Sequence, residues 1–299
     1  MKNSSMRPTV ASVLVGIPRY YSSILPRLLA TLRMNPEDLV GAFFWRYPGK
    51  DIPQTSQGHY PSPITDAEWE SLLKTSNFDA SEILPPITLP SESHLKIEHT
   101  LTAKLGLKPN PVATLSWLTA LAHGAKLLGD LDPNHQRDFW VIARPDLRVN
   151  KRSLSIVLKR LASDNSFLVN SVAIASRRKP HTVLELVDEK VNLPVDHFFI
   201  GRPETIAKFM ELPTFVHASV TGMDTRQPVV NEFLIGQFFK DNEMQQFPVK
   251  FGYLVWRGSW LGSLSGFGRR GISLARSQLA AWMRYQSDSL FPGVQQRGH

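Results

Sequence analysis

Short apolar, β-branched segments alternate with helical patterns along the whole chain, and this alternation restricts the fold more than any other feature. Residues 9–15 (TVASVLV) end at a Gly-Ile-Pro-Arg turn, and a helical pattern follows over 24–32. Residues 39–45 (LVGAFFW) form a second apolar run. Two such strands with a helix between them make a right-handed βαβ unit. The sequence therefore predicts an α/β fold with a mostly parallel central sheet flanked by helices.

Further elements continue this alternation towards the end of the chain. A 3.6-residue apolar period predicts helices, and short β-branched or aromatic runs predict strands. The predicted helices cover residues 65–73, 112–128, 151–162, 204–211, 229–239 and 272–285, the last of them amphipathic and basic. The predicted strands cover residues 139–143, 166–175, 196–201 and 248–256. Two proline-containing segments, 46–63 and 83–90, are predicted as surface connections.

The length and apolar content of the chain suffice for a sizeable core. With 299 residues, of which 42% are hydrophobic, we expect one large domain over residues 1–260 and a C-terminal basic amphipathic helix and tail over 261–299. We see no run of about 18 apolar residues and no cleavable leader, so a cytoplasmic protein is expected. The absence of cysteine excludes disulfides, zinc-thiolate sites and thiol nucleophiles.

The balance of charges favours phosphate-rich partners. Lys and Arg number 34 against 26 Asp and Glu, which gives a formal net charge of +8. Nucleic acid, an anionic membrane surface and a nucleotide diphosphate all fit this number. The basic residues gather in short clusters, such as 177–179 and 269–270, rather than in a long basic tail. Such clusters are also typical of a solvated face.

Polar residues that directly follow an apolar strand receive the most weight, because ligands of open α/β sheets bind at the carboxyl ends of the strands. After the first strand, Gly16 permits close approach of a ligand and Arg19 is able to grip a phosphate. After the central strand (FWVIA), Arg144, Asp146 and Arg148 follow within five residues. Two cations and a carboxylate suit a diphosphate together with a ribose hydroxyl or a divalent metal, for which Asp146 is the ligand. A mutual salt bridge in a surface turn is the alternative.

Acidic residues at two other places are candidates for acid–base chemistry. Asp196 and His197 stand at the start of a predicted strand, and Glu232 stands in the first turn of a predicted helix. A carboxylate at either place is able to assist an acceptor hydroxyl. Structural roles are the alternatives, which for Glu232 means an interaction with the helix dipole. The sequence has no G-x-G-x-x-G, P-loop, nucleophile elbow or H-E-x-x-H, so dinucleotide-binding, ATPase, hydrolase and zinc-enzyme functions have no motif support.

In this order, the pieces resemble a family of bacterial surface-polysaccharide (lipopolysaccharide and capsule) glycosyltransferases with a GT-A-like fold. The resemblance is carried by G-x-x-R (Gly16, Arg19), W-V-I-A-R-P-D-L (140–147), V-D-H-F-F-I-G (195–201) and N-E-F-L (231–234), over roughly residues 9–240. It implies a Rossmann-type nucleotide-sugar domain. It also implies transfer of a sugar from a nucleotide-diphosphate donor to a glycan or lipid-linked acceptor in surface-polysaccharide synthesis.

The resemblance further implies roles for the site residues. The donor nucleotide is approached by Gly16 and Arg19, a metal-binding D-x-D is replaced by Arg144 and Asp146, and the sugar or acceptor is faced by Asp196 and Glu232. Because an arginine stands at the first D-x-D position, use of Mn²⁺ or Mg²⁺ stays open and the arginine itself is a candidate to neutralise the diphosphate. The basic C-terminal helix suits a peripheral approach to the inner face of the cell membrane. The alternatives are a non-catalytic nucleic-acid-binding protein and an assembly subunit on a degenerate transferase fold.

Overall fold

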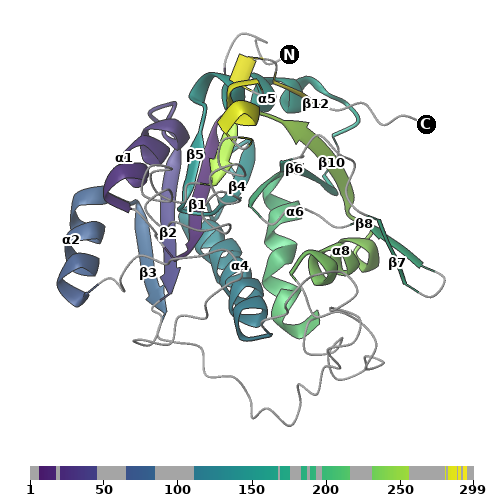
Figure 1. Cartoon of the computed structure of the whole chain (residues 1–299), viewed down its shortest axis with the longest axis horizontal. Helices are drawn as coiled ribbons and strands as arrows, with labels where there is room; N and C mark the ends of the chain where they lie inside the picture. Colours follow the sequence, from purple (N-terminus) through teal and green to yellow (C-terminus); the bar gives the residue numbers. More distant parts are fainter. Residues whose placement is uncertain are drawn as a thin grey trace, which may run out of the picture.

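An eight-stranded sheet runs through the middle of the protein, with helices on both of its faces (Figure 1). The computed structural model describes residues 7–17, 21–45, 65–84, 111–167, 169–175, 183–186, 189–192, 197–215, 231–255, 280, 282–287, 289–290 and 292–294. The strands lie in the order β12-β10-β6-β9-β4-β1-β2-β3. Their bounds are β1 Val10–Gly16, β2 Leu39–Trp45, β3 Ala80–Leu84, β4 Phe139–Ala143, β6 Ser171–Ala175, β9 Phe198–Gly201, β10 Gln245–Lys250 and β12 Gly293–Val294.

Six strands of this sheet are parallel and two run the other way, which confirms the predicted α/β fold with a mostly parallel sheet. β1 is parallel to β2 and β4, β2 to β3, and β6 to β10. β9 is antiparallel to both β4 and β6, and β12 is antiparallel to β10. Two small antiparallel sheets accompany it: β5 (Leu147–Val149) pairs with β11 (Tyr253–Val255), and β7 (Val183–Leu186) pairs with β8 (Glu189–Asn192).

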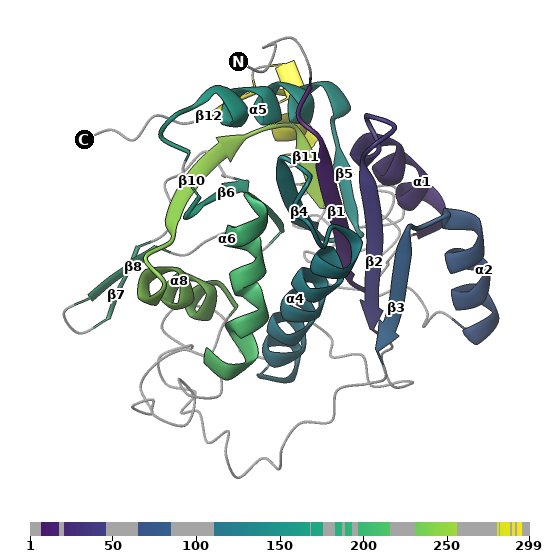
Figure 2. The same cartoon turned by 180° about the vertical axis from the view of Figure 1, so that it is seen from behind.

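A hydrophobic core lies on each face of the sheet. One face packs against α4 (Pro111–Leu131), α6 (Pro203–Ala207), the 3-10 helix η2 (Lys208–Glu211) and α8 (Asn231–Asp241), as Figure 2 shows. The other face packs against α1 (Tyr21–Leu32), α2 (Asp66–Ser76) and α5 (Lys151–Ser163). Along β1, Val13 belongs to the first core and Leu14 to the second. A strand that is buried on both faces needs apolar residues at almost every position, which explains the uninterrupted runs in the sequence.

The order of the strands reverses between β1 and β4. From β1 the chain passes through α1 to β2 and then through α2 to β3, while β4 lies on the other side of β1. The helices also change face at this point, because α1 and α2 pack on one core and α4, which precedes β4, packs on the other. In open α/β sheets, ligands bind at such a switch point, outside the carboxyl ends of the two strands.

The C-terminal part of the chain returns to the sheet. Residues 280, 282–287 and 289–290 are helical, and we call them the C-terminal helix. Beyond it, β12 extends the main sheet, and Arg160 of α5 donates a 3.0 Å hydrogen bond to the carbonyl oxygen of Pro292. Residues 272–279 lie outside the described residues, so the beginning of the expected helix over 272–285 stays a prediction. Among the described residues, no helix is both long and apolar enough to cross a membrane.

Two sequence-based expectations about the strands are wrong. Residues 83–90 were expected to form a surface connection, but residues 83 and 84 end β3, which pairs in parallel with β2. The sequence ASEIL is a weak signal, because an edge strand is paired on one side and tolerates polar residues. The strand expected over 248–256 is divided into β10 and β11, and Pro248 lies inside β10.

Candidate functional site

Gly16 ends β1 at the switch point, in a conformation that favours glycine. Its φ is +121°, a region that residues with a side chain rarely adopt. A Cβ at this position would lie 3.3 Å from the ring of Trp117 and 3.7 Å from Cδ of Pro145. The backbone of Gly16 is therefore packed between α4 and the turn that follows β4, and the close approach of a ligand to it stays a prediction.

Arg144 and Asp146 form a bidentate ion pair in that turn. Nε of Arg144 donates to Oδ1 of Asp146 at 3.0 Å, and Nη2 donates to Oδ2 at 2.7 Å. The Asp146 side chain is 3% exposed and that of Arg144 is 23% exposed. A buried carboxylate needs a counter-ion, and the paired geometry fixes the plane of the guanidinium group. The mutual salt bridge that was weighed as an alternative is thus formed, although it is largely buried.

Asp146, which Arg144 pairs with, is also the predicted metal ligand. Both oxygens of Asp146 already accept hydrogen bonds from Arg144. Among the described residues, no group of three or more histidine, aspartate or glutamate side chains gathers to hold an ion. Divalent cations such as Mn²⁺ and Mg²⁺ require several oxygen or nitrogen ligands around them. Asp146 is therefore fixed against Arg144 among the described residues, and its role as a metal ligand stays a prediction.

His197 comes to the same place because β9 is reversed. Its neighbour Phe198 is paired with Ala143, so the start of β9 lies beside the end of β4. The backbone N–H of Arg144 donates to the carbonyl oxygen of His197 at 3.2 Å. The buried imidazole ring packs edge-on against Tyr253 of β11, with ring centroids 6.0 Å apart. The sequence marked His197 only as a secondary candidate, since the direction of β9 cannot be derived from its own residues.

Trp117 of α4 is a member of this site that the sequence did not reveal. Its side chain is buried against Gly16, and its indole N–H has no acceptor among the described residues. Trp140, by contrast, donates its indole N–H to Asp132 at 2.9 Å. Buried donors are nearly always paired, so an orphaned one invites a ligand oxygen. Both tryptophans stand in apolar runs of the sequence, and no sequence signal distinguishes them.

The remaining predicted residues are placed as follows. Arg19 and Asp196 lie outside the described residues. Glu232 is the second residue of α8 and stands half-buried in its first turn, on the face of the sheet that α4 covers. Their joint action with Arg144 stays a prediction.

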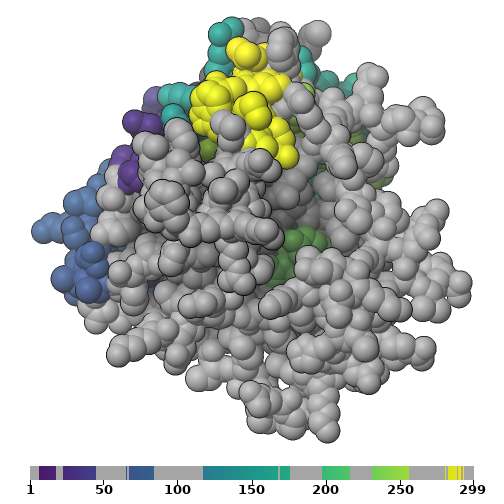
Figure 3. All heavy atoms as spheres, in the orientation of Figure 1, coloured from purple at the N-terminus to yellow at the C-terminus, as the bar shows by residue number. Residues whose placement is uncertain are grey.

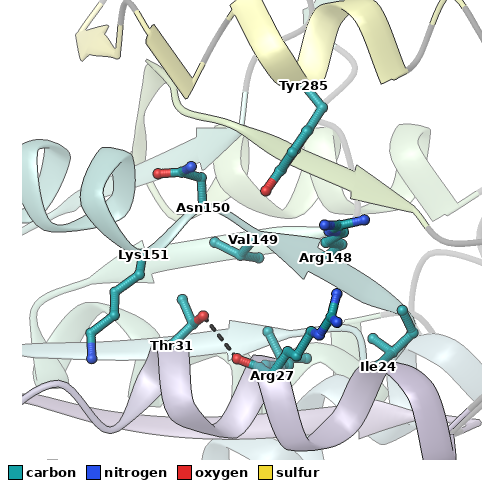
Figure 4. Close-up of a pocket in the computed structure, with 9 residues that line it drawn as sticks. Ile24, Arg27, Thr31, Arg148, Val149, Asn150, Lys151 and Tyr285 are labelled. Atoms are coloured by element: carbon teal, nitrogen blue, oxygen red, sulfur yellow. Dashed lines mark hydrogen bonds between the residues drawn. The ribbon is translucent and has the colours of Figure 1, made fainter.

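Arg148 lines a pocket that the sequence did not predict. The cavity measures about 240 Å³ and is bounded by α1, by β5 with the start of α5, and by the C-terminal helix (Figure 4). Arg148 lies over the ring of Tyr285, with Cζ 5.7 Å from the ring centroid. Arg27 and Lys151 line the same cavity. Their positions in α1 and α5 carry no motif, so the cluster becomes visible only in the folded chain.

Comparison with known proteins adds no assignment. No protein-family model matches the chain, and no curated protein matches its sequence.

Proposed function

We propose that the chain is a glycosyltransferase with a GT-A-like fold that moves a sugar from a nucleotide-diphosphate donor to a glycan or lipid-linked acceptor in surface-polysaccharide synthesis. The observation that carries the proposal is the Arg144–Asp146 pair at the switch point of the sheet. An arginine fixed bidentately by a buried carboxylate is a preorganised phosphate binder, because its orientation is set before the ligand arrives.

The order of the parallel strands supports a nucleotide-binding sheet. Numbered among themselves along the chain, the six parallel strands lie in the order 3-2-1-4-5-6, with β9 inserted between the fourth and the fifth. This is the strand order of doubly wound dinucleotide-binding folds, in which the phosphates lie at the switch point. Gly16 and Arg144 follow the two strands that form this point in the present chain.

The donor half of the proposed reaction requires stabilisation of the negative charge on the leaving diphosphate. When the acceptor hydroxyl oxygen bonds to the anomeric carbon, the bond from that carbon to the diphosphate breaks and the diphosphate leaves with additional negative charge. Arg144 stabilises this charge in a largely buried turn, where electrostatic interactions are stronger than in water. Gly16 stands beside this turn, and the indole N–H of Trp117, which packs against Gly16, has no acceptor among the described residues.

The acceptor side requires a base for the hydroxyl proton. We assign this role to Asp196 or Glu232, with His197 beside Arg144 as a further candidate. A carboxylate that accepts this proton makes the acceptor oxygen more nucleophilic as the new bond forms.

The test is a donor screen combined with one conservative substitution. The protein is mixed with UDP-, GDP-, CMP- and dTDP-sugars, with and without Mn²⁺, and its thermal stability and sugar turnover are measured. We expect one donor class to raise Tm, since a ligand that binds only the folded state stabilises it. Arg144→Lys keeps the charge beside Asp146 but loses the bidentate fork, and we expect a kcat about 100-fold lower, the effect of losing one oriented donor.

The matched control is Arg33→Lys. Arg33 also pairs with an aspartate, Asp79, at 3.2 Å, and its side chain is 27% exposed. It follows the end of α1 and lies away from the switch point. Turnover should change by less than about twofold in this variant, as is usual for a partly exposed pair. Full turnover in Arg144→Lys or Asp146→Ala would remove the assignment, and salt-sensitive binding of DNA or RNA without any donor binding would favour the nucleic-acid alternative.

A further inference from the structure

The pocket between α1, β5 and the C-terminal helix has the charge of an anion site. Its nine described lining residues include three cations, Arg27, Arg148 and Lys151, and no carboxylate. Figure 4 shows the guanidinium groups of Arg27 and Arg148 facing the same space. An anion bound in this space would be attracted by all three of these side chains.

The start of α5 adds to this positive field. Asn150 caps the helix by accepting a 2.9 Å hydrogen bond from the N–H of Ser153, and Lys151 and Arg152 follow in the first turn, which contains no acidic residue. Cations at the positive end of a helix dipole are unfavourable for the helix alone. Lys151, one of these two cations, lines the cavity, and a negative ligand there would offset its unfavourable position.

Tyr285 provides an independent sign of a ligand. Its side chain comes from the C-terminal helix, is only 9% exposed, and directs its hydroxyl group into the pocket (Figure 4). That hydroxyl makes no hydrogen bond to any described residue. The hydroxyl opens onto the cavity, where an anion oxygen would accept a hydrogen bond from it.

The helix that supplies Tyr285 also exposes large apolar side chains. Trp282, Met283 and Leu290 are 47%, 54% and 73% exposed. Trp282 and Leu290 are eight residues apart, and with Met283 they fall on one side of a helix, next to the side that carries Tyr285 and Ser289. Figure 3 shows the C-terminal residues on the outer surface of the protein. Tryptophan beside basic residues is typical of the interface between water and lipid.

The apolar surface is held firmly beside the pocket. A Cβ on Gly252 would lie 1.9 Å from Oγ of Ser289, so the C-terminal helix is in close contact with the chain before β11. The Arg160–Pro292 hydrogen bond and the pairing of β12 with β10 fix the segment beyond it. The cations lie in the pocket that the C-terminal helix closes, and we call them, together with the exposed apolar side chains of that helix, the binding face.

We propose that this face binds an anionic membrane. The phosphate of a lipid headgroup enters the pocket between Arg27, Arg148 and Lys151, and Tyr285 donates its hydroxyl hydrogen to it. Trp282, Met283 and Leu290 enter the lipid interface beside it. Electrostatic attraction and apolar insertion together give stable attachment where either alone is weak. The net charge of +8 acts in the same direction. The proposal goes beyond the transferase function, since membrane binding requires neither donor nor acceptor.

The experiment is sedimentation of the full chain with lipid vesicles. We expect binding to vesicles that contain phosphatidylglycerol and little binding to phosphatidylcholine alone. Arg27→Ala/Lys151→Ala should bind the anionic vesicles about 30-fold more weakly, the effect of two basic residues at an anionic surface. Lys74→Ala/Lys159→Ala removes the same charge from exposed positions outside the pocket and should bind within about threefold of the unmodified chain.

The apolar contribution is tested separately. Trp282→Ser/Met283→Ser should lose most vesicle binding, whereas Val169→Ser, at a residue that is 60% exposed elsewhere, should retain it. Vesicles should also shift the tryptophan emission to the blue, and Trp282→Phe should abolish that shift. Lys151→Ala alone replaces the double variant if thermal unfolding shows that the latter does not fold. Equal losses in the pocket and control variants, or binding of inorganic phosphate without binding of vesicles, would overturn the proposal.

Discussion

Residues at the carboxyl ends of β1 and β4 affect both the stability of the fold and the proposed binding of a ligand. Asp146 is buried, and Arg144 supplies the counter-ion that a buried carboxylate requires. Trp117 leaves an indole N–H without an acceptor among the described residues, which costs about 1–3 kcal/mol in an interior. Unfavourable local features, such as a buried donor without an acceptor, are common where a protein binds its ligand.

Gly16→Ala tests whether the backbone conformation at position 16 requires glycine. We expect the free energy of unfolding to fall by about 2 kcal/mol, because a φ of +121° is strained for alanine. Donor affinity should fall as well, since the new Cβ would lie 3.3 Å from Trp117. Urea unfolding measures the first effect. Gly129→Ala in α4, where a Cβ would lie 3.8 Å from the ring of Trp140, is the control and should raise stability by about 0.5 kcal/mol.

At the scale of elements, close contacts and caps determine how the helices are placed. Gly124 lets α4 approach β1, because a Cβ there would lie 2.5 Å from Cγ2 of Val15. This approach also brings Trp117, seven residues earlier in α4, to Gly16. α2 begins with a capping box, in which Thr65 and Glu68 bond reciprocally. The sequence of residues 65–68 (TDAE) has the capping-box pattern, whereas the close approach of α4 has no local sequence signal.

The capping box predicts a pH dependence. Hydrogen bonds from the backbone N–H and the hydroxyl of Thr65 lower the pKa of Glu68. The carboxylate therefore adds stability that is fully present above the ordinary glutamate pKa and is lost as the pH falls through the lowered value. Glu68→Gln should be less stable than the unmodified chain at neutral pH, and the difference should shrink in acid when urea unfolding is repeated across pH. Glu70→Gln removes an equal charge outside the box and serves as the comparison.

At the scale of the whole molecule, segments that are distant in sequence pack together. The C-terminal helix closes the pocket that α1, β5 and α5 begin, and β12 adds the last strand to the sheet. The contact between Gly252 and Ser289 is the tightest point of this assembly, since a Cβ would also lie 2.9 Å from Cα of Ser289.

Gly252→Ala should release the C-terminal helix. A methyl group has no room there, so the helix must move, and hydrogen exchange should become faster in residues 280–290 while the amides of β1 and β4 stay protected. Vesicle binding should weaken in the same variant. Ser289→Gly in the Gly252→Ala background removes the nearest atoms and should restore part of the protection. Unchanged exchange in Gly252→Ala would contradict the packing described.

Much of the architecture could be predicted from local sequence patterns. The apolar runs of β1, β2 and β4 identify strands buried on both faces, and the 3.6-residue period identifies α4 and α5. β3 was missed because an edge strand carries a weaker pattern. β5, with three residues, is too short for any pattern, and β11 was predicted only as part of one longer strand over 248–256; the two strands pair with each other.

The candidate site could likewise be predicted only in part from the sequence. The types and order of residues were sufficient to place Gly16, Arg144 and Asp146 at the carboxyl ends of parallel strands, which share one edge of the sheet, and to suggest a salt bridge in the second turn. The sequence did not predict that β1 and β4 are neighbours, that Arg148 lies against Tyr285, or that His197 arrives through the reversed β9. The periodicity of apolar residues depends on each segment alone, so it can be recognised in the sequence. Contacts such as that of Arg27 with the pocket of Tyr285 depend on how separate segments pack, and packing exists only in the folded protein.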